Sequence, residues 1–121
     1  MTRILVVDND FSNADAIQMV LENLEYVVKS INQPELLKDT IEKFMPDLII
    51  MDILLGNSDG RVLCDLIKAD SKTAHIPVML ITAMMRSQAN AITCQADSLM
   101  LKPFDFLKFA EEVHTLIHGK L

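Results

Sequence analysis

The side chains best suited to chemistry in this sequence stand at the ends of short apolar runs. They are Asp8, Asn9 and Asp10 after the first run, Asp52 after a second, Thr82 at the end of a third and Lys102 after a fourth. Carboxylate and amide oxygens suit a hard divalent cation such as Mg²⁺ or Mn²⁺, whereas a lysine and a hydroxyl suit phosphoryl oxygens. If these positions converge, they favour attack by Asp52 on a phosphoryl group, which would give an aspartyl phosphate.

The apolar runs predict the strands that must position these side chains. The expected strands are residues 4–7, 26–31, 48–52, 78–82 and 99–101. Apolar residues at helical spacing predict helices between and after them, the first capped by Ser12 or Asn13, and the others over residues 34–45, 61–67, 85–95 and 106–117. Residues 85–95 are expected to form the least stable helix, because their apolar stripe is thin.

Five strands that alternate with five helices predict an α/β fold. With right-handed crossovers, the strands form a doubly wound parallel sheet that is covered by helices on both faces. The carboxyl ends of parallel strands share one edge, where ligands and reactive groups gather. Asp8 and Asp10 have a simpler reading as acids at a helix start, favoured by the helix dipole. Asp52 is harder to explain in this way, because it closes a strand that is apolar throughout.

Length and composition narrow the classes of function. The 121 residues suit one domain, residues 1–121, and half of them are hydrophobic, as in a packed globule. The absence of a long apolar run predicts a cytoplasmic protein without a membrane span or signal peptide. A net charge of −6, without clustered Lys and Arg, argues against direct nucleic-acid binding. Cys64 and Cys94 lack metal-ligand or redox-motif spacing and are expected to be buried thiols.

The order and spacing of four motifs resemble the response-regulator receiver domains of two-component signalling. These motifs are ILVVDND, LIIMDILLGNSDG, PVMLITA and the KPF that starts at Lys102, and the resemblance runs from Arg3 to the last helix. It implies a flavodoxin-like (βα)5 fold with strand order 2-1-3-4-5. It also implies a signalling switch with at most autophosphatase activity, rather than a classical enzyme.

The resemblance further implies a role for each matching residue. Asp52 would accept a phosphoryl group from a histidine kinase or a histidine phosphotransfer protein, and Thr82, the Ala83 amide and Lys102 would bind it. The implied Mg²⁺ ligands are Asp8, Asn9, Asp52 and the Leu54 carbonyl, with Asp10 as a further candidate. The Lys102-Pro103 bond would be cis. The face near the last two helices would meet an output partner that the sequence does not name, or a second copy of the chain.

Four positions affect how such a site is expected to work. Asn9 replaces the second acid of the first-strand pair, which predicts weaker Mg²⁺ binding, with Asp10 as a substitute ligand. Leu99 replaces the usual aromatic residue of the switch, so that output is expected to depend on Thr82 and on backbone shifts. Leu54 and Met84 are apolar at positions that tune the access of water, and they predict a long-lived phosphoryl state.

Two other functions remain open from the sequence. A phosphorylation-impaired receiver would act only as a docking module, as the substitutions at Asn9 and Leu99 allow. Alternatively, the Asp8-x-Asp10 pattern resembles the nucleophile motif of haloacid dehalogenase-type phosphatases, in which Asp8 would be phosphorylated. That family needs a further acidic pair late in the chain, and the acids after Lys102 do not follow a later apolar strand.

Overall fold

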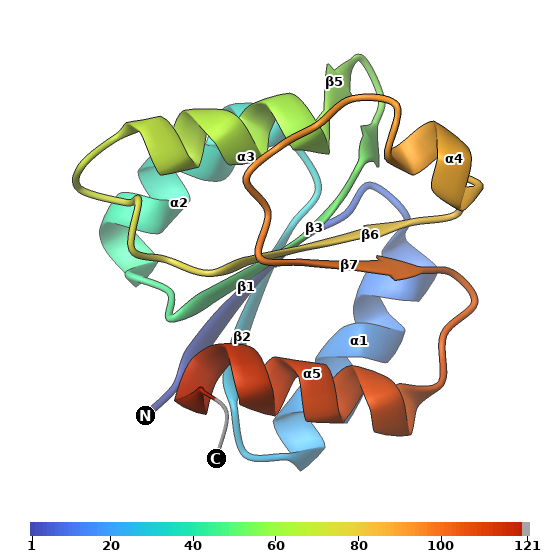
Figure 1. The fold of residues 1–121 in the computed structure, drawn as a ribbon. Helices are drawn as coiled ribbons and strands as arrows, with labels where there is room; N and C mark the ends of the chain where they lie inside the picture. The colour runs from blue at the N-terminus through green and yellow to red at the C-terminus, as the bar shows by residue number, and fades with distance from the viewer. Residues whose placement is uncertain (120–121) are drawn as a thin grey trace.

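A five-stranded parallel sheet forms the centre of the protein. In the computed structural model, which describes residues 1–119, the strands are β1 (Arg3–Val7), β2 (Val27–Ile31), β3 (Leu48–Asp52), β6 (Val78–Thr82) and β7 (Ser98–Leu101). They lie in the order β2-β1-β3-β6-β7, and every neighbouring pair is parallel. Numbered among themselves, these strands have the predicted order 2-1-3-4-5, so the flavodoxin-like fold is confirmed (Figure 1).

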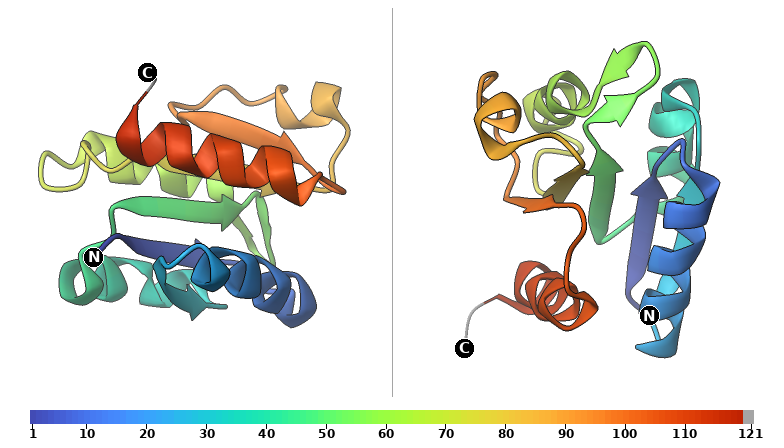
Figure 2. Two further views of the ribbon diagram at one scale, coloured as in Figure 1. Left: turned by 90° about the horizontal axis from the view of Figure 1, so that it is seen from below. Right: turned by 90° about the vertical axis from the view of Figure 1, so that its right-hand side faces the viewer.

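Helices cover both faces of this sheet, as Figure 2 shows from two further directions. On one face lie α1 (Phe11–Asn23) and α5 (Phe106–His118); on the other lie the 3-10 turn η1 (Pro34–Leu36), α2 (Leu37–Phe44), α3 (Gly60–Ala69) and α4 (Arg86–Ala89). Two hydrophobic clusters fill the spaces between the layers, one on each face. The central strands are buried on both faces, which explains their uninterrupted apolar runs. None of the helices within residues 1–119 could cross a membrane.

The start of α1 differs from the prediction. Ser12 and Asn13 do not cap this helix, because the helix begins earlier, at Phe11. Its N-cap is Asp10, whose Oδ1 accepts hydrogen bonds from the backbone N–H groups of Ser12 at 3.1 Å and Asn13 at 3.2 Å. An aspartate satisfies these free N–H groups well, and its charge suits the helix dipole. The simpler interpretation of Asp10 as a helix-start acid is therefore right for this residue.

Two further elements differ from the expected pattern. The helix predicted over residues 85–95 is wrong in length: α4 has four residues, and the chain after it is irregular and mostly exposed. Ala89 is the one buried residue of α4, so little apolar surface stabilises a longer helix. A small antiparallel hairpin, β4 (Leu54–Leu55) and β5 (Ser58–Asp59), follows β3 and was not predicted. It turns at Gly56, whose φ of 64° suits glycine.

Candidate functional site

Asp52 and Lys102 meet at the edge formed by the carboxyl ends of the strands. Asp52 is the last residue of β3 and is 5% exposed, and Lys102 follows β7 directly. The Lys102 Nζ donates to Asp52 Oδ2 at 2.7 Å, and its backbone N–H donates to the Thr82 carbonyl, also at 2.7 Å. The other Asp52 oxygen, Oδ1, accepts the Leu54 N–H at 3.0 Å. The parallel sheet thus brings together two residues that are fifty positions apart.

Asp8 completes this cluster from the neighbouring strand. It follows β1, is 1% exposed, and places Oδ2 3.6 Å from the Lys102 Nζ. Its Oδ1 accepts the Asp10 N–H at 2.9 Å, and its Oδ2 accepts a hydrogen bond from the Asn13 Nδ2. Asn13 is therefore a site residue that sequence reasoning missed. Its position in the first turn of α1 could have indicated the contact, since α1 begins directly beside the end of β1.

The charges in this cluster are not balanced, because two carboxylates share one ammonium group. Burial raises the pKa of Asp52, and the nearby charge of Asp8 adds to that rise, while the hydrogen bonds from Lys102 and the Leu54 N–H oppose it. For Lys102, burial lowers the pKa, but the hydrogen bond to Asp52 and the charges of Asp52, Asp8 and Asp10 outweigh burial and raise it. The net negative charge would attract a cation, and the lysine would attract a phosphoryl group.

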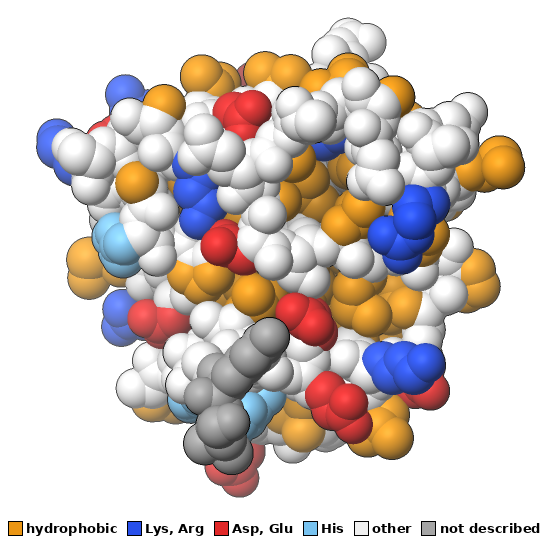
Figure 3. Space-filling view, viewed as in Figure 1, with side chains coloured by type: hydrophobic (Ala, Val, Ile, Leu, Met, Phe, Trp, Pro, Cys, Tyr) orange, Lys and Arg blue, Asp and Glu red, His pale blue; other side chains and the backbone are white. Residues whose placement is uncertain are grey.

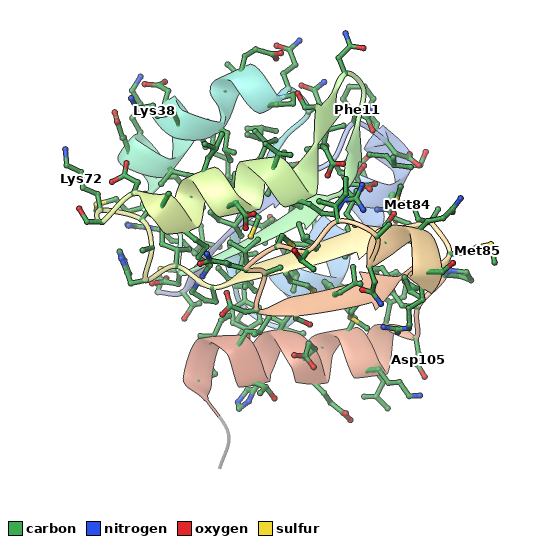
Figure 4. The ribbon with its side chains drawn as sticks, turned by 45° about the horizontal axis from the view of Figure 1, so that its top comes forward. Phe11, Lys38, Lys72, Met84, Met85 and Asp105 are labelled. Atoms are coloured by element: carbon green, nitrogen blue, oxygen red, sulfur yellow. The ribbon has the colours of Figure 1, made fainter. Side chains whose placement is uncertain are left out.

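Thr82, the other predicted phosphate ligand, ends β6 beside the end of β3. Its side chain is fully buried, and its Oγ1 accepts the Met84 N–H at 3.1 Å. Ala83 follows as an exposed residue of the same loop. Figure 4 shows Met84 and Met85 at the same end of the molecule as Phe11 and Asp105, where the loops after β1, β6 and β7 meet. Leu99 lies further back, half-buried in β7 and paired with Leu80 of β6.

The remaining predicted metal ligands lie in the loops around the carboxylates. Asn9 is exposed, Asp10 is exposed and caps α1, and Leu54 belongs to the hairpin strand β4. Within residues 1–119 no three Asp, Glu, His or Cys side chains are grouped as metal ligands. The donor set would therefore combine two carboxylates, from Asp8 and Asp52, with amide and carbonyl oxygens. Mg²⁺ accepts such oxygen ligands and completes its shell with water, so the residues fit this ion.

The segment after Asp52 packs tightly against its backbone. Gly60 begins α3 and donates its N–H to the Ile53 carbonyl at 2.8 Å. A Cβ at this position would lie 2.3 Å from the Asp52 carbonyl oxygen, so a side chain does not fit there. The next residue, Arg61, is 5% exposed and forms an ion pair with Asp59. Sequence reasoning also missed this buried arginine, because an arginine on a helix is usually solvated.

Comparisons with known proteins agree with this arrangement. The family model of the response regulator receiver domain matches residues 4–114. The chain is 30% identical over 119 residues to the DNA-binding dual master transcriptional regulator RpaA of a Synechocystis species. The aligned region makes up 97% of this chain and 49% of RpaA. It is also 30% identical to the response regulator PleD of Caulobacter vibrioides over 98% of this chain and 27% of PleD. The chain thus spans half or less of the length of these relatives.

The fold comparison gives a matching result. A solved receiver domain of a signal transduction histidine kinase from Syntrophus aciditrophicus superimposes with a TM-score of 0.90 at 28% identity. The match covers 98% of this chain and 92% of that one.

Proposed function

Because this chain belongs to the response-regulator receiver family, we propose that it is a phosphoryl-accepting switch of a two-component phosphorelay, with Asp52 as the acceptor. The observation that carries the proposal is the 2.7 Å contact between the buried Asp52 carboxylate and Lys102, with Asp8 beside them. A buried acid at the end of an apolar strand has a cost in stability. A role in phosphoryl transfer explains why the chain keeps it.

The proposed reaction transfers a phosphoryl group from a phosphohistidine, or from a small phosphodonor, to Asp52. An Asp52 carboxylate oxygen forms a bond to phosphorus while the bond between phosphorus and the donor breaks. From a phosphohistidine the phosphorus–nitrogen bond breaks, and the imidazole leaves with its electron pair and gains a proton. From acetyl phosphate the phosphorus–oxygen bond breaks, and acetate leaves with its electron pair. Lys102 neutralises charge on the phosphoryl oxygens, and the Thr82 hydroxyl and Ala83 N–H donate to them. Positioning and charge neutralisation account for most catalysis of this kind.

A divalent cation, Mg²⁺ or Mn²⁺, is part of the proposal. Asp8, Asn9, Asp52 and the Leu54 carbonyl would hold it, and the bound ion would neutralise charge on the phosphoryl group during transfer. Asp10 is a weaker candidate, because its Oδ1 already caps α1. With one formal charge fewer at Asn9 than an acid would supply, we expect weaker binding of this ion than in a receiver with the full acid pair.

The surroundings of Asp8 argue against its role as the nucleophile of a phosphatase. One of its oxygens accepts the Asp10 N–H, and the other is shared between Asn13 and Lys102, whereas each Asp52 oxygen accepts one hydrogen bond, from the Leu54 N–H or from Lys102. Asp52 lies closer to the lysine than Asp8 does. We therefore assign the phosphoryl group to Asp52 rather than to Asp8.

We further propose that residues 1–121 form one receiver domain that acts in the cytoplasm as a switch rather than a classical enzyme. Its donor would be a histidine kinase or a histidine phosphotransfer protein, and its output partner, or a second copy of the chain, would bind near the last two helices. We expect no direct binding of nucleic acid by these residues. The basic side chains on the face in Figure 3 are dispersed among acidic and apolar ones, which agrees with this expectation.

The test is the intact mass of the protein after incubation with acetyl phosphate, with and without Mg²⁺. We expect the gain of one phosphoryl group that depends on the metal and is lost in Asp52→Asn. Asp8→Asn serves as the comparison, since it should slow the reaction without moving its site. If no divalent ion supports phosphorylation, the chain is a docking module instead.

A further inference from the structure

We propose that Arg61 is a positioning residue that carries the phosphorylation state of Asp52 to α4. This inference rests on the proposed function, because it concerns how the same site is read. In this chain Leu99 stands where an aromatic switch residue is expected, and Thr82 with the backbone that follows it is one remaining connection between the site and the neighbouring surface. The buried arginine is a second connection, since it joins the segment after Asp52 to the end of α4.

The contacts of Arg61 reach in two directions. Toward the hairpin, its Nε donates to Asp59 Oδ1 at 3.0 Å and its Nη2 donates to Asp59 Oδ2 at 2.7 Å, in a bidentate pair. Toward α4, its Nη1 donates to the carbonyls of Gln88 at 3.0 Å and Ala89 at 3.1 Å. The planar guanidinium therefore fixes both groups in one geometry, which a lysine ammonium does not reproduce.

The hairpin end of this connection is fixed to Asp52 itself. Asp59 and Gly60 lie at the start of α3, and the Gly60 N–H donates to Ile53, the residue after the acceptor. Gly60 is so close to the Asp52 carbonyl that even one added carbon would collide with it. A change in the backbone at Asp52 therefore moves Gly60, and with it the Asp59–Arg61 pair, because the contact leaves no space to absorb the change.

The α4 end has little else to hold it. This helix has four residues, of which Ala89 alone is buried, and near its end the Gln88 carbonyl accepts the Ala91 N–H at 3.2 Å. Arg61 supplies donors to the Gln88 and Ala89 carbonyls. Beside it lies a cavity of about 460 Å³ that is lined by Arg61, Ala89, Ile92 and Leu99 among others. Within residues 1–119, the hydrogen bonds of Arg61 are the ones that join this end of α4 to another element of the fold.

The proposed consequence is that the phosphorylation state of Asp52 and the position of α4 influence each other. Phosphorylation of Asp52 changes the hydrogen bonds of both its oxygens, which now involve Leu54 and Lys102, and the resulting shift of the hairpin alters how Arg61 holds α4. By thermodynamic linkage, if phosphorylation changes the affinity of a partner that binds and displaces α4, then binding of that partner changes the phosphorylation equilibrium of Asp52 by the same factor.

The test follows hydrogen exchange of the Ala89 and Asn90 amides, which bond to Met85 and Arg86 within α4, before and after phosphorylation. In wild type we expect their exchange to change on phosphorylation. In Arg61→Met we expect exchange at least about tenfold faster in the unphosphorylated state, the factor for one lost hydrogen bond to a charged donor, with no further change on phosphorylation. Intact mass must still show the phosphoryl group on Arg61→Met.

Two further variants complete the test. Arg86→Met removes an exposed arginine from α4 itself, and it should keep the wild-type response. Arg61→Lys keeps a positive charge beside Asp59 without the planar fork and should lose the response, and it decides the question if Arg61→Met does not fold. A wild-type response in phosphorylated Arg61→Met or Arg61→Lys would overturn the proposal, as would phosphorylated wild type without any change in α4. Absence of phosphoryl transfer to wild type would instead refute the proposed function.

Discussion

Replacing Lys102 by methionine should destabilise the protein in a pH-dependent manner. Methionine has a similar length but no charge, so that Asp52 and Asp8, which are 5% and 1% exposed, lose their common cation. At an effective dielectric constant of about 20, the attractions at 2.7 Å and 3.6 Å are about 6 and about 5 kcal/mol before desolvation is counted. Removing one partner of a buried ion pair costs about 3–5 kcal/mol. Because Lys102 is itself 19% exposed, we expect a loss of about 2–4 kcal/mol at neutral pH.

The sign of the pH dependence follows from the pKa of Asp52. Burial already raises this pKa in the folded protein, and Lys102 opposes the rise, so the variant raises the pKa further. The folded variant therefore binds a proton that the unfolded chain releases. The stability that this proton adds is fully present below the pKa of Asp52 in the unfolded chain, about 4. It is lost as the pH rises through the higher pKa of Asp52 in the folded variant. The difference in unfolding free energy between wild type and Lys102→Met should thus be largest at neutral pH and shrink on acidification.

Urea unfolding at several pH values measures this difference, with equal m-values as the check on two-state behaviour. The matched control is Lys43→Met, which removes a lysine whose Nζ lies 3.1 Å from Asp39 on the surface. Those side chains are 78% and 65% exposed, so the control should lose no more than about 0.5 kcal/mol. A difference in unfolding free energy between wild type and Lys102→Met that does not change with pH would refute the reasoning. A variant as stable as wild type at neutral pH would also refute it.

Three other substitutions test separate parts of the site. Gly60→Ala should cost about 1–3 kcal/mol in urea unfolding, because its Cβ collides with the Asp52 carbonyl, and an unchanged midpoint would contradict the tight contact. Asn9→Asp should tighten Mg²⁺ binding in calorimetric titration by about tenfold, through about 1.4 kcal/mol of added attraction; no gain would exclude this position as a ligand. Leu54→Asn combined with Met84→Glu should shorten the lifetime of the phosphorylated protein, measured as loss of phosphoryl mass with time, and an unchanged lifetime would remove these side chains from the account.

The sheet was predictable because its signals are local and strong. Apolar runs such as Leu48–Met51 are buried on both faces, and alternation with helices fixes the parallel order. The meeting of Asp8, Asp52 and Lys102 then follows from topology alone, since the ends of neighbouring parallel strands share an edge. The cis bond between Lys102 and Pro103 also agrees with what the family resemblance implied.

The parts that were not predictable depend on contacts that a sequence pattern does not contain. The cap of α1 could be assigned to any of several polar residues, and the geometry selects Asp10. The hairpin after β3 is stabilised by backbone pairing over two residues on each side, too short for a pattern of alternation. An arginine on a helix is usually exposed, and Arg61 is buried here because α4 packs against it in the folded protein.

The most direct test of the central claim is the position of the phosphoryl group. After reaction with acetyl phosphate and Mg²⁺, borohydride reduces an aspartyl phosphate to homoserine, which peptide mass spectrometry assigns to one residue. We predict homoserine at position 52. Homoserine at position 8 would contradict the account and favour a phosphatase-like mechanism, and unmodified aspartate at both positions would contradict phosphoryl acceptance altogether.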